Sequence, residues 1–244
     1  MRNPTVCRSI FDSPATELRR CPVLNQKNEY CRFKIILLKW RFKYSQMNLR
    51  EIILHYKEVS EPCLDEICGS ANIIEVEPGD VIVRQGELCN AFYINRDGIF
   101  RVSHANNQTD NTILFGTEGD IYTSLHSYFA NQPAAFSLVA LEQGSVYELT
   151  YNTIRHLIAK YRDFADWMLY IATGQLYALE RRYVKYATTT AEDRLYNFMA
   201  NDEPYIKRVS AKLLTLRIPL KYIASYLQIT PSTLSRLRRK LVGK

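Results

Sequence analysis

Polar and basic side chains near the C-terminus have the types and spacing that nucleic-acid recognition requires. Arg236 is our first candidate for a base contact, because a guanidinium can bond to O6 and N7 of one guanine at the same time. Ser232 and Ser235 are adaptable base readers. Basic side chains further along such a helix run beside phosphates, which fix the register of binding without reading sequence. The predicted DNA-binding residues are Thr230, Ser232, Thr233, Ser235, Arg236, Arg238, Arg239 and Lys240.

Two short helices must position these side chains. Residues 219–227 form an amphipathic stretch with Pro219 in its first turn, where a missing N–H costs nothing. Residues 228–229 supply the turn, and Thr230 followed by Pro231 predicts a capped start for the second helix. The residues spaced to form a small core between the helices are Ile223, Leu227, Ile229, Leu234, Leu237 and Leu241, with Ala224 at the crossing. The alternative is a solvated basic helix.

The charge distribution supports a polyanion-binding end. Residues 205–244 contain ten Lys or Arg and no acidic residue, whereas residues 47–204 contain twelve basic and twenty-two acidic residues. This pattern is typical of a soluble body with a nucleic-acid-binding module. No apolar run approaches the roughly 20 residues of a membrane span, and no secretory segment is present, so we expect a cytoplasmic protein without membrane contact.

The cysteines and histidines do not have the spacing of a metal site. None of the cysteines forms a CxxC pair, and the four histidines are far apart in the sequence. Zinc and iron–sulfur sites depend on tightly spaced ligands, so we predict reduced, mostly buried thiols and no metal. The cysteines are Cys7, Cys21, Cys31, Cys63, Cys68 and Cys89.

Residues 1–46 form a basic extension that differs from the rest of the chain. It contains three prolines and shows little periodicity, and Met47 is followed by a helix pattern at 49–56. Our hypothesis is that Met47 is the biological start, so that residues 1–46 are poorly ordered or not native. The alternative is a genuine basic arm. The intact mass of the native protein separates the two.

Short strands are expected from residue 72 to residue 149. Asp97-Gly98 is typical of a hairpin turn, and Pro78-Gly79 marks another turn. The regular turn spacing predicts an antiparallel barrel or jelly roll. The expected strands are 73–77, 81–87, 91–94, 99–102, 112–115, 137–141 and 145–149.

Helices follow the strands. We expect one helix over 151–161, a long one over about 163–186, and a third for which residues 188–190 supply the N-cap, with Glu192 and Asp193 placed to complete a capping box. The long helix carries an apolar stripe, which either packs on the barrel or pairs with a second copy of the chain. We favour the dimer. The predicted dimerisation residues are Phe164, Trp167, Met168, Ile171, Leu176, Leu179 and Tyr183.

Residues 223–238, IASYLQITPSTLSRLR, resemble the helix-turn-helix of the Crp/Fnr family of transcriptional regulators, and residues 76–87 resemble its cyclic-nucleotide-binding-like barrel. The resemblance covers roughly residues 47–244. It implies an α+β protein with a sensory domain at 47–162, a dimerisation helix at 163–187 and a helix-turn-helix domain at 188–244. It also implies a homodimer with double-stranded DNA and RNA polymerase as partners, and no enzymatic activity.

The expected nucleotide-binding cassette departs from the family pattern. Thr123-Ser124 stands where nucleotide-binding members have Gly-Glu, and Ala134 or Ala135 stands where they have Arg. Because residues 102–154 contain no Lys or Arg, a phosphate there would lack a local cation, and we predict no tight binding of cyclic AMP. The effector remains unknown.

Other sensors of the family also fit poorly. Cys63, Cys68 and Cys89 do not match an iron–sulfur cluster, and His104 and His126 are only weak haem ligands. The chain stops at residue 244, so we expect no wing after the recognition helix. Any strand pairing would come from residues 213–218.

Two rival functions remain. A cupin-like metalloenzyme would need a His-rich triad on neighbouring strands, which the sparse histidines do not supply. A ligand-binding or interaction module whose basic end binds RNA or an acidic partner is the second alternative. Competition between a palindromic duplex and single-stranded RNA distinguishes it from a DNA-binding regulator.

Overall fold

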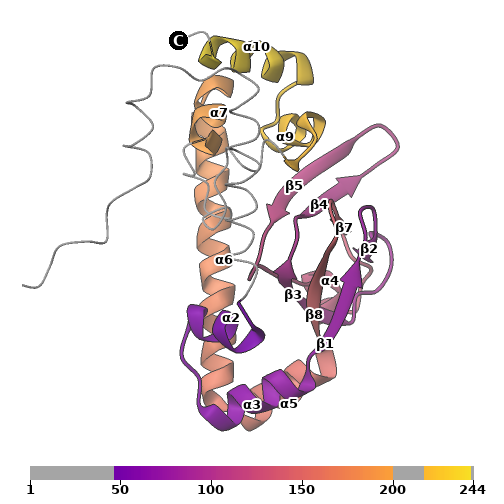
Figure 1. Cartoon of the computed structure of the whole chain (residues 1–244), viewed down its shortest axis with the longest axis vertical. Coiled ribbons are helices and arrows are strands. Elements are labelled where there is room, and N and C mark those ends of the chain that lie inside the picture. The colour runs from indigo at the N-terminus through magenta and orange to yellow at the C-terminus, as the bar shows by residue number, and fades with distance from the viewer. Residues whose placement is uncertain (1–46, 200–216, 243–244) are drawn as a thin grey trace, which may run out of the picture. The chain divides into compact units, whose positions relative to one another are not determined.

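The computed structural model describes residues 47–199 and 217–242, without the side chains of the last two (Figure 1). The basic segment 1–46, the expected helix end at 201–204 and most of 213–218 lie outside the described residues. Within the described part, no helix combines the length and the apolar character that a membrane crossing requires.

The strands form an antiparallel β-sandwich, which confirms the expected fold class. One sheet has the strand order β1-β8-β3-β6 and the other has the order β2-β7-β4-β5, and all pairs are antiparallel. The strands are β1 (Asn72–Val76), β2 (Val81–Val83), β3 (Ala91–Asp97), β4 (Phe100–Ala105), β5 (Asp110–Gly116), β6 (Ile121–Tyr122), β7 (Ser137–Ala140) and β8 (Gly144–Thr150).

The hairpin predicted at Asp97-Gly98 is wrong. Strand β3 pairs with β6 and β8, whereas β4 pairs with β5 and β7, so the chain changes sheets at this turn. Gly98 has φ +90°, which L side chains rarely adopt, and a Cβ on Gly144 would lie 2.5 Å from the Asp97 carbonyl oxygen. The Asp-Gly pair therefore specifies a tight corner but not which strands pair on either side of it.

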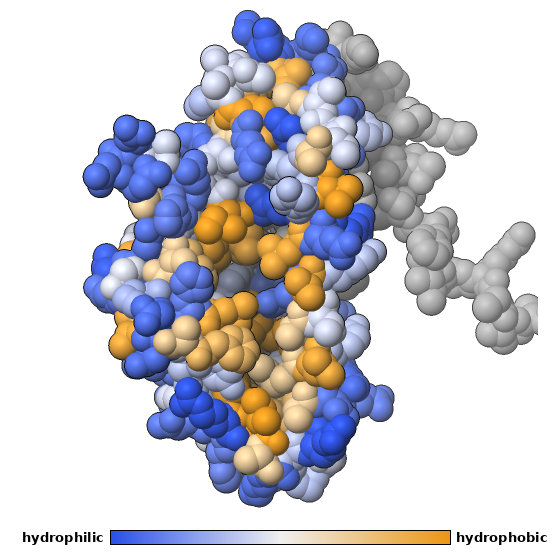
Figure 2. Space-filling model, turned by 180° about the vertical axis from the view of Figure 1, so that it is seen from behind, coloured by the Kyte–Doolittle hydropathy of each residue, from blue (hydrophilic) through white to orange (hydrophobic). Residues whose placement is uncertain are grey.

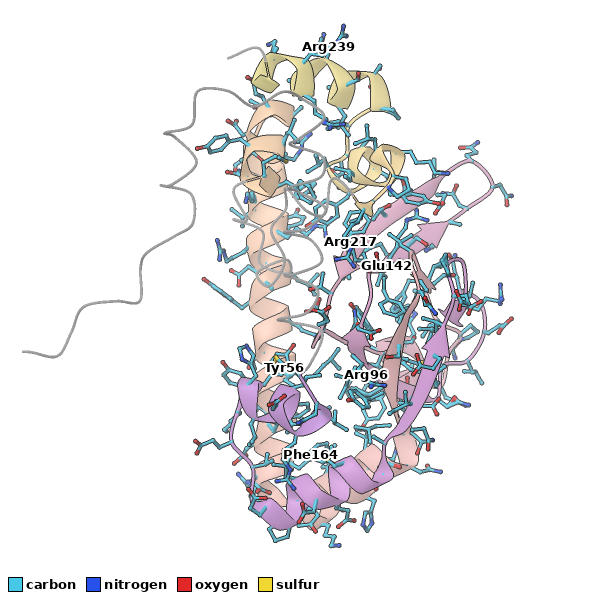
Figure 3. The ribbon with its side chains drawn as sticks, in the orientation of Figure 1. Tyr56, Arg96, Glu142, Phe164, Arg217 and Arg239 are labelled. Carbon is cyan, nitrogen blue, oxygen red and sulfur yellow. The ribbon has the colours of Figure 1, made fainter. Side chains whose placement is uncertain are left out.

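Helices α2 (Leu49–Tyr56), α3 (Glu61–Ser70), α5 (Tyr151–Lys160) and the start of α6 (Arg162–Thr188) share one apolar core with the sandwich. Trp167 anchors this core, because its ring stacks on Phe164 at 5.6 Å and its indole N–H donates to the Ile53 carbonyl oxygen at 2.9 Å. Phe164 and Tyr56 lie on α6 and α2 respectively (Figure 3). The remaining helices are α4 (Leu125–Ala130), α7 (Ala191–Met199), α9 (Leu220–Tyr226) and α10 (Pro231–Val242).

This core corrects part of the predicted dimer stripe. Phe164, Trp167 and Ile171 are 0%, 3% and 8% exposed, and Met168 packs against the same core. They face their own chain because a 27-residue helix presents one face to the helices and sandwich and another to solvent. Only Leu176, Leu179 and Tyr183 of the predicted set are exposed.

Glu66 of α3 forms a polar clamp with α5 and the residue after it. Its carboxylate accepts hydrogen bonds from Lys160 Nζ at 2.6 Å and Tyr161 Oη at 2.7 Å, and contacts His156 Nε2 at 2.8 Å. The bonds from Lys160 and Tyr161 lower the pKa of Glu66 from 4.5 to about 2.

The clamp predicts an acid-sensitive contribution to stability. Because the pKa of Glu66 is lower in the folded chain, its contribution is fully present above pH 4.5 and is lost as the pH falls from 4.5 towards 2. Glu66→Gln should therefore lower the melting temperature at pH 7, and its difference from wild type should shrink below pH 4.5. Glu58→Gln, in an exposed connection, is the control. A difference that stays constant down to pH 3 would contradict the assignment.

Candidate nucleic-acid interface

Helices α9 and α10 form the predicted pair, joined by a tight turn. Gln228 has φ +55°, and the N–H of Ile229 donates back to the Ala224 carbonyl oxygen at 3.0 Å, which closes the end of α9. Thr230 Oγ1 accepts the N–H of Thr233 at 3.1 Å, and α10 begins at Pro231. The predicted cap and the predicted start of the second helix are confirmed.

The contact between the two helices is apolar, as the spacing predicted. Ile223, Leu227 and Leu234 are at most 1% exposed, and Leu237 is 6% exposed. Ala224 is fully buried, consistent with the expected close crossing. Ile229 is half-buried, and the side chain of Leu241 lies outside the described residues. This core determines which face of α10 remains in solvent.

The solvent face of α10 carries the residues predicted to read bases. Ser232, Ser235, Arg236 and Arg239 are exposed and occupy positions i, i+3, i+4 and i+7 of the helix, so they share one side of it. Arg239 is marked on α10 in Figure 3. Thr230 is also exposed, whereas Thr233 and Arg238 are half-buried at the flanks. The fold thus brings most of the predicted site together on one surface.

Lys240 differs from the other predicted contacts. Its Nζ lies 3.7 Å from the Glu192 carboxylate of α7, with both side chains about 60% exposed. An exposed pair at this distance is weak, but it competes with a phosphate for the ammonium group. Arg239 is therefore the cleaner candidate for a phosphate contact.

Two side chains outside the predicted site hold this helix pair in place. Arg194 of α7 donates from Nε to the Leu227 carbonyl oxygen at 2.9 Å, and Tyr186 of α6 donates its hydroxyl to the Tyr226 carbonyl oxygen at 2.5 Å. Helix α7 begins in the predicted capping box, in which Asp193 accepts from Thr190 N–H and donates its own N–H to Thr190 Oγ1. Sequence reasoning missed Arg194 and Tyr186 because carbonyl partners at the end of a distant helix leave no local pattern.

The segment expected to form the nucleotide cassette is hydrogen-bonded to its own barrel. Ser127 Oγ donates to the Gln132 carbonyl oxygen at 2.8 Å and accepts from Cys89 N–H. Ala134 donates its N–H to the Glu87 carbonyl oxygen at 2.8 Å and accepts from Gly86 N–H at 2.9 Å. The backbone groups at Ala134, where a phosphate would need donors, are therefore engaged elsewhere.

Aromatic side chains fill the adjoining interior. Tyr122 is 6% exposed, and a Cβ on Gly116 would lie 1.2 Å from its hydroxyl oxygen, so glycine leaves room for the ring. Phe100 is fully buried, with its ring centroid 6.4 Å from that of Tyr122. His104 and His126 are exposed, and His104 Nδ1 contacts the Ala135 carbonyl oxygen at 2.7 Å.

We expect cyclic AMP to produce no binding heat above that of AMP in calorimetry. The phosphate would lie in a segment without Lys or Arg from 102 to 154, at a cost on the order of several kcal/mol for an uncompensated charge. Micromolar or tighter affinity would contradict this prediction.

The described residues offer no cluster of three or more metal-ligating side chains. Cys63, Cys68 and Cys89 are free thiols, and burial raises the pKa of Cys63 to about 11. A thiol with a raised pKa is a poor nucleophile and a poor metal ligand at neutral pH.

Comparisons with known proteins identify the sandwich. Residues 73–161 match the family model of the cyclic nucleotide-binding domain. The structure of FixK2 from Bradyrhizobium japonicum superimposes with a TM-score of 0.61 at 17% identity, covering 71% of this chain and 85% of that one. A Ruegeria pomeroyi protein described as cyclic nucleotide binding gives 0.52 at 19% identity, covering 76% and 81%. No curated protein matches the sequence.

At these identities the structural likeness establishes the fold alone. The matched range begins in β1 and ends just after α5, so it spans the strands of the sandwich. Residues 73–161 are therefore similar to a cyclic nucleotide-binding domain, and they are followed in the chain by the long helix α6 and the helix pair α9–α10.

Proposed function

We propose that this protein is a homodimeric transcription regulator of the Crp/Fnr type that binds double-stranded DNA through α10. The observation that carries the proposal is the solvent face of α10, where Ser232, Ser235, Arg236 and Arg239 lie opposite the buried Leu234 and Leu237. A helix fixed by its apolar side, with serine and arginine on the free side, has the chemistry of a major-groove reader.

Different positions along α10 are suited to contact bases and phosphates. Arg236 lies in the second turn, within reach of base edges when the N-terminal half of the helix enters the groove. Arg239 lies one turn further on, where the groove wall presents phosphates. Thr230 and Thr233 at the start of the helix are suited to the phosphates on the other side.

The exposed face of α6 supports the dimer. Leu169, Ala172, Leu176, Leu179 and Tyr183 are all exposed and follow the alternating three- and four-residue spacing of a coiled-coil seam. This seam keeps Leu176, Leu179 and Tyr183 from the sequence prediction and replaces the buried members by Leu169 and Ala172. Figure 2 shows apolar side chains gathered in a hollow on the face opposite to that of Figure 1.

A parallel pairing of two α6 helices suits the DNA proposal. Two-fold symmetry places both reading helices on the same side, as successive half-sites about 34 Å apart require. A row of exposed leucines is unfavourable on a monomer, because burying apolar surface contributes roughly 25 cal/mol of free energy per Å² and a monomer leaves this surface in water.

In this proposal the cyclic nucleotide-binding domain does not use cyclic AMP. Two observations support the absence of cyclic AMP binding. The backbone groups of Ala134 are hydrogen-bonded within the barrel, and the aromatic rings of Phe100 and Tyr122 are buried in its interior. Cytoplasmic location, contact with RNA polymerase and the absence of catalysis remain parts of the same proposal.

Sequence-specific DNA binding is tested by selecting bound duplexes from a random pool and then titrating the protein with the selected sequence. We expect a palindromic site, a stoichiometry of one dimer per site, and affinity that falls steeply with salt. Excess single-stranded RNA should not displace the duplex. Preferred binding to RNA would instead favour the alternative, an interaction module with a basic end.

A further inference from the structure

A buried arginine of the barrel lies against the first helix of the reading pair. Arg101 of β4 is 4% exposed, and all three nitrogens of its guanidinium donate hydrogen bonds. Its Nε donates to Thr112 Oγ1 at 2.9 Å, and its Nη1 and Nη2 donate to the two carboxylate oxygens of Asp110 at 3.0 and 2.6 Å. Buried charges occur where partners are fixed, so this arginine is held in one orientation.

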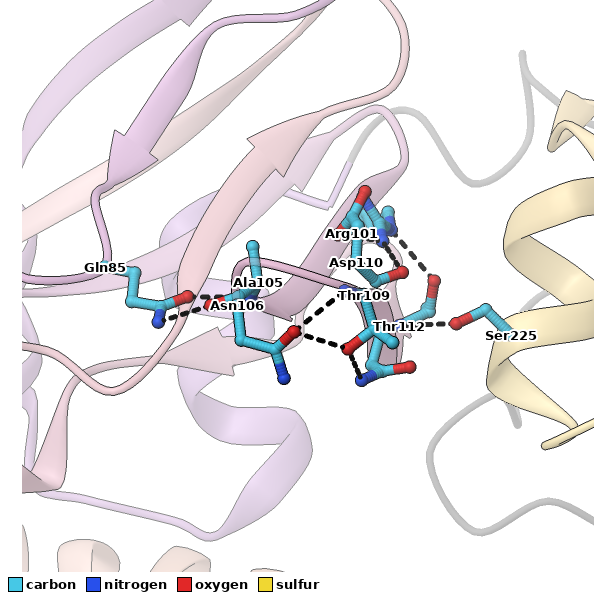
Figure 4. Close-up of polar contacts among 9 residues, drawn as sticks. Gln85, Arg101, Ala105, Asn106, Thr109, Asp110, Thr112 and Ser225 are labelled. Carbon is cyan, nitrogen blue, oxygen red and sulfur yellow. Dashed lines mark hydrogen bonds and ion pairs between the residues drawn. The ribbon is translucent and has the colours of Figure 1, made fainter.

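The free face of that guanidinium lies on α9. Its Cζ is 4.1 Å from the ring centroid of Tyr222, close enough for a cation–π contact. Beside it, the N–H of Thr112 donates to Ser225 Oγ at 2.8 Å (Figure 4). Because β5 is the edge strand of its sheet, its outward N–H groups have no neighbouring strand, and Ser225 supplies the acceptor for this one.

The β4–β5 hairpin that carries these groups is braced at its other side. Gln85 donates to and accepts from the backbone of Ala105, with both bonds at 2.9 Å. In the turn, Asn106 Oδ1 accepts the N–H of Gln108 at 2.9 Å. It also accepts the N–H of Thr109 at 2.8 Å (Figure 4). These bonds fix the conformation of the hairpin turn.

Two further contacts tie the reading pair to the same body. Arg217 forms a two-pronged ion pair with Glu142 in the turn between β7 and β8 (Figure 3). Arg182 of α6 lies with its Cζ 4.3 Å from the ring centroid of Tyr226 and donates to the Ile113 carbonyl oxygen of β5. None of these contacts uses Ser232, Ser235, Arg236 or Arg239, so the reading face stays free.

We propose that Arg101, Tyr222 and Ser225 are positioning residues that hold the reading helix at the orientation DNA requires. The proposal rests on the proposed DNA-binding function. A dimer that reads two half-sites needs its two α9–α10 pairs at a set spacing. A pair that is already held in place loses less conformational entropy on binding. Loss of the contacts should therefore weaken binding without removing any phosphate contact.

Two variants test this role in the full chain. Ser225→Ala removes the acceptor of the Thr112 N–H, and Tyr222→Leu removes the ring beneath Arg101. Tyr196→Leu, on the exposed side of α7, is the matched control. Hydrogen exchange followed by NMR measures the protection of the Thr112 amide, which depends directly on the contact. Titration with the selected duplex measures the effect on DNA affinity.

We expect the Thr112 amide to exchange on the order of tenfold faster in Ser225→Ala, with the amides of β3 and β8 unchanged. Both variants should bind duplex roughly tenfold more weakly, with an unchanged slope of log affinity against log salt, because the phosphate contacts remain. Tyr196→Leu should match the wild type in both measurements.

The remaining outcomes separate the two proposals. Unchanged exchange at Thr112 would show that the contact is absent and would overturn the positioning role. Faster exchange with unchanged duplex affinity would overturn it while leaving DNA binding intact. A wild type that binds no duplex would overturn the proposed function, and the positioning role with it, even where the exchange data demonstrate the contact.

Discussion

Leu176→Asp is expected to turn the proposed dimer into monomers and to weaken binding to a two-half-site duplex by roughly 10²- to 10⁴-fold, the range that loss of avidity gives. Leu176 is 66% exposed at the middle of the α6 seam, with Leu169 and Tyr183 one heptad to either side. A carboxylate there would face its symmetry mate in a dry interface, where neither charge has a partner.

Sedimentation equilibrium measures the change in mass, and duplex titration measures the change in affinity. Tyr170→Asp is the matched control, because Tyr170 is 53% exposed on another side of α6. It should remain a dimer. A dimeric Leu176→Asp, or a monomeric Tyr170→Asp, would place the interface elsewhere.

Arg236→Ala is expected to reduce affinity for the selected site by about 1–3 kcal/mol, or roughly 5- to 150-fold, while non-specific affinity changes far less. The loss follows from a bidentate contact to one guanine, so base preference should relax at a single position of each half-site. Arg236→Lys should not restore it, because an ammonium group lacks the planar fork of donors.

Arg239→Ala is the matched control on the same face of the helix. It should weaken all sequences alike and reduce the salt slope by about one, as expected for a phosphate contact. Lys240 is less suitable for this purpose because its Nζ lies near Glu192. Equal loss of specificity in the two variants, or no loss in Arg236→Ala, would show that α10 does not read bases as assigned.

Local chemistry made the helix ends predictable. Thr150, Thr190 and Thr230 each cap a helix in the structure, and each precedes a stretch with helical periodicity. The pair α9–α10 was predictable for the same reason, since its caps, turn and core lie within about 25 residues. The strands were found through turn residues, although β6, with only two residues, was too short to detect.

Long-range pairing was not predictable in the same way. The Asp97-Gly98 corner has a local signature identical to that of a hairpin, and only the partners of β3 and β4 in different sheets distinguish the two. Helices α3 and α4 were also missed. Their short amphipathic patterns depend on a core supplied by residues far away in the chain.

The sequence by itself determined where α10 begins, which residues it carries and that its segment is strongly basic, because caps, periodicity and charge are local properties. Only the tertiary structure decided which face of α6 is free, since Phe164 and Leu169 look alike as apolar residues until the sandwich and helices α2, α3 and α5 cover one of them. It also decided that Arg101 lies against Tyr222, 121 residues away. Such contacts arise from packing between distant segments, and no local pattern encodes them.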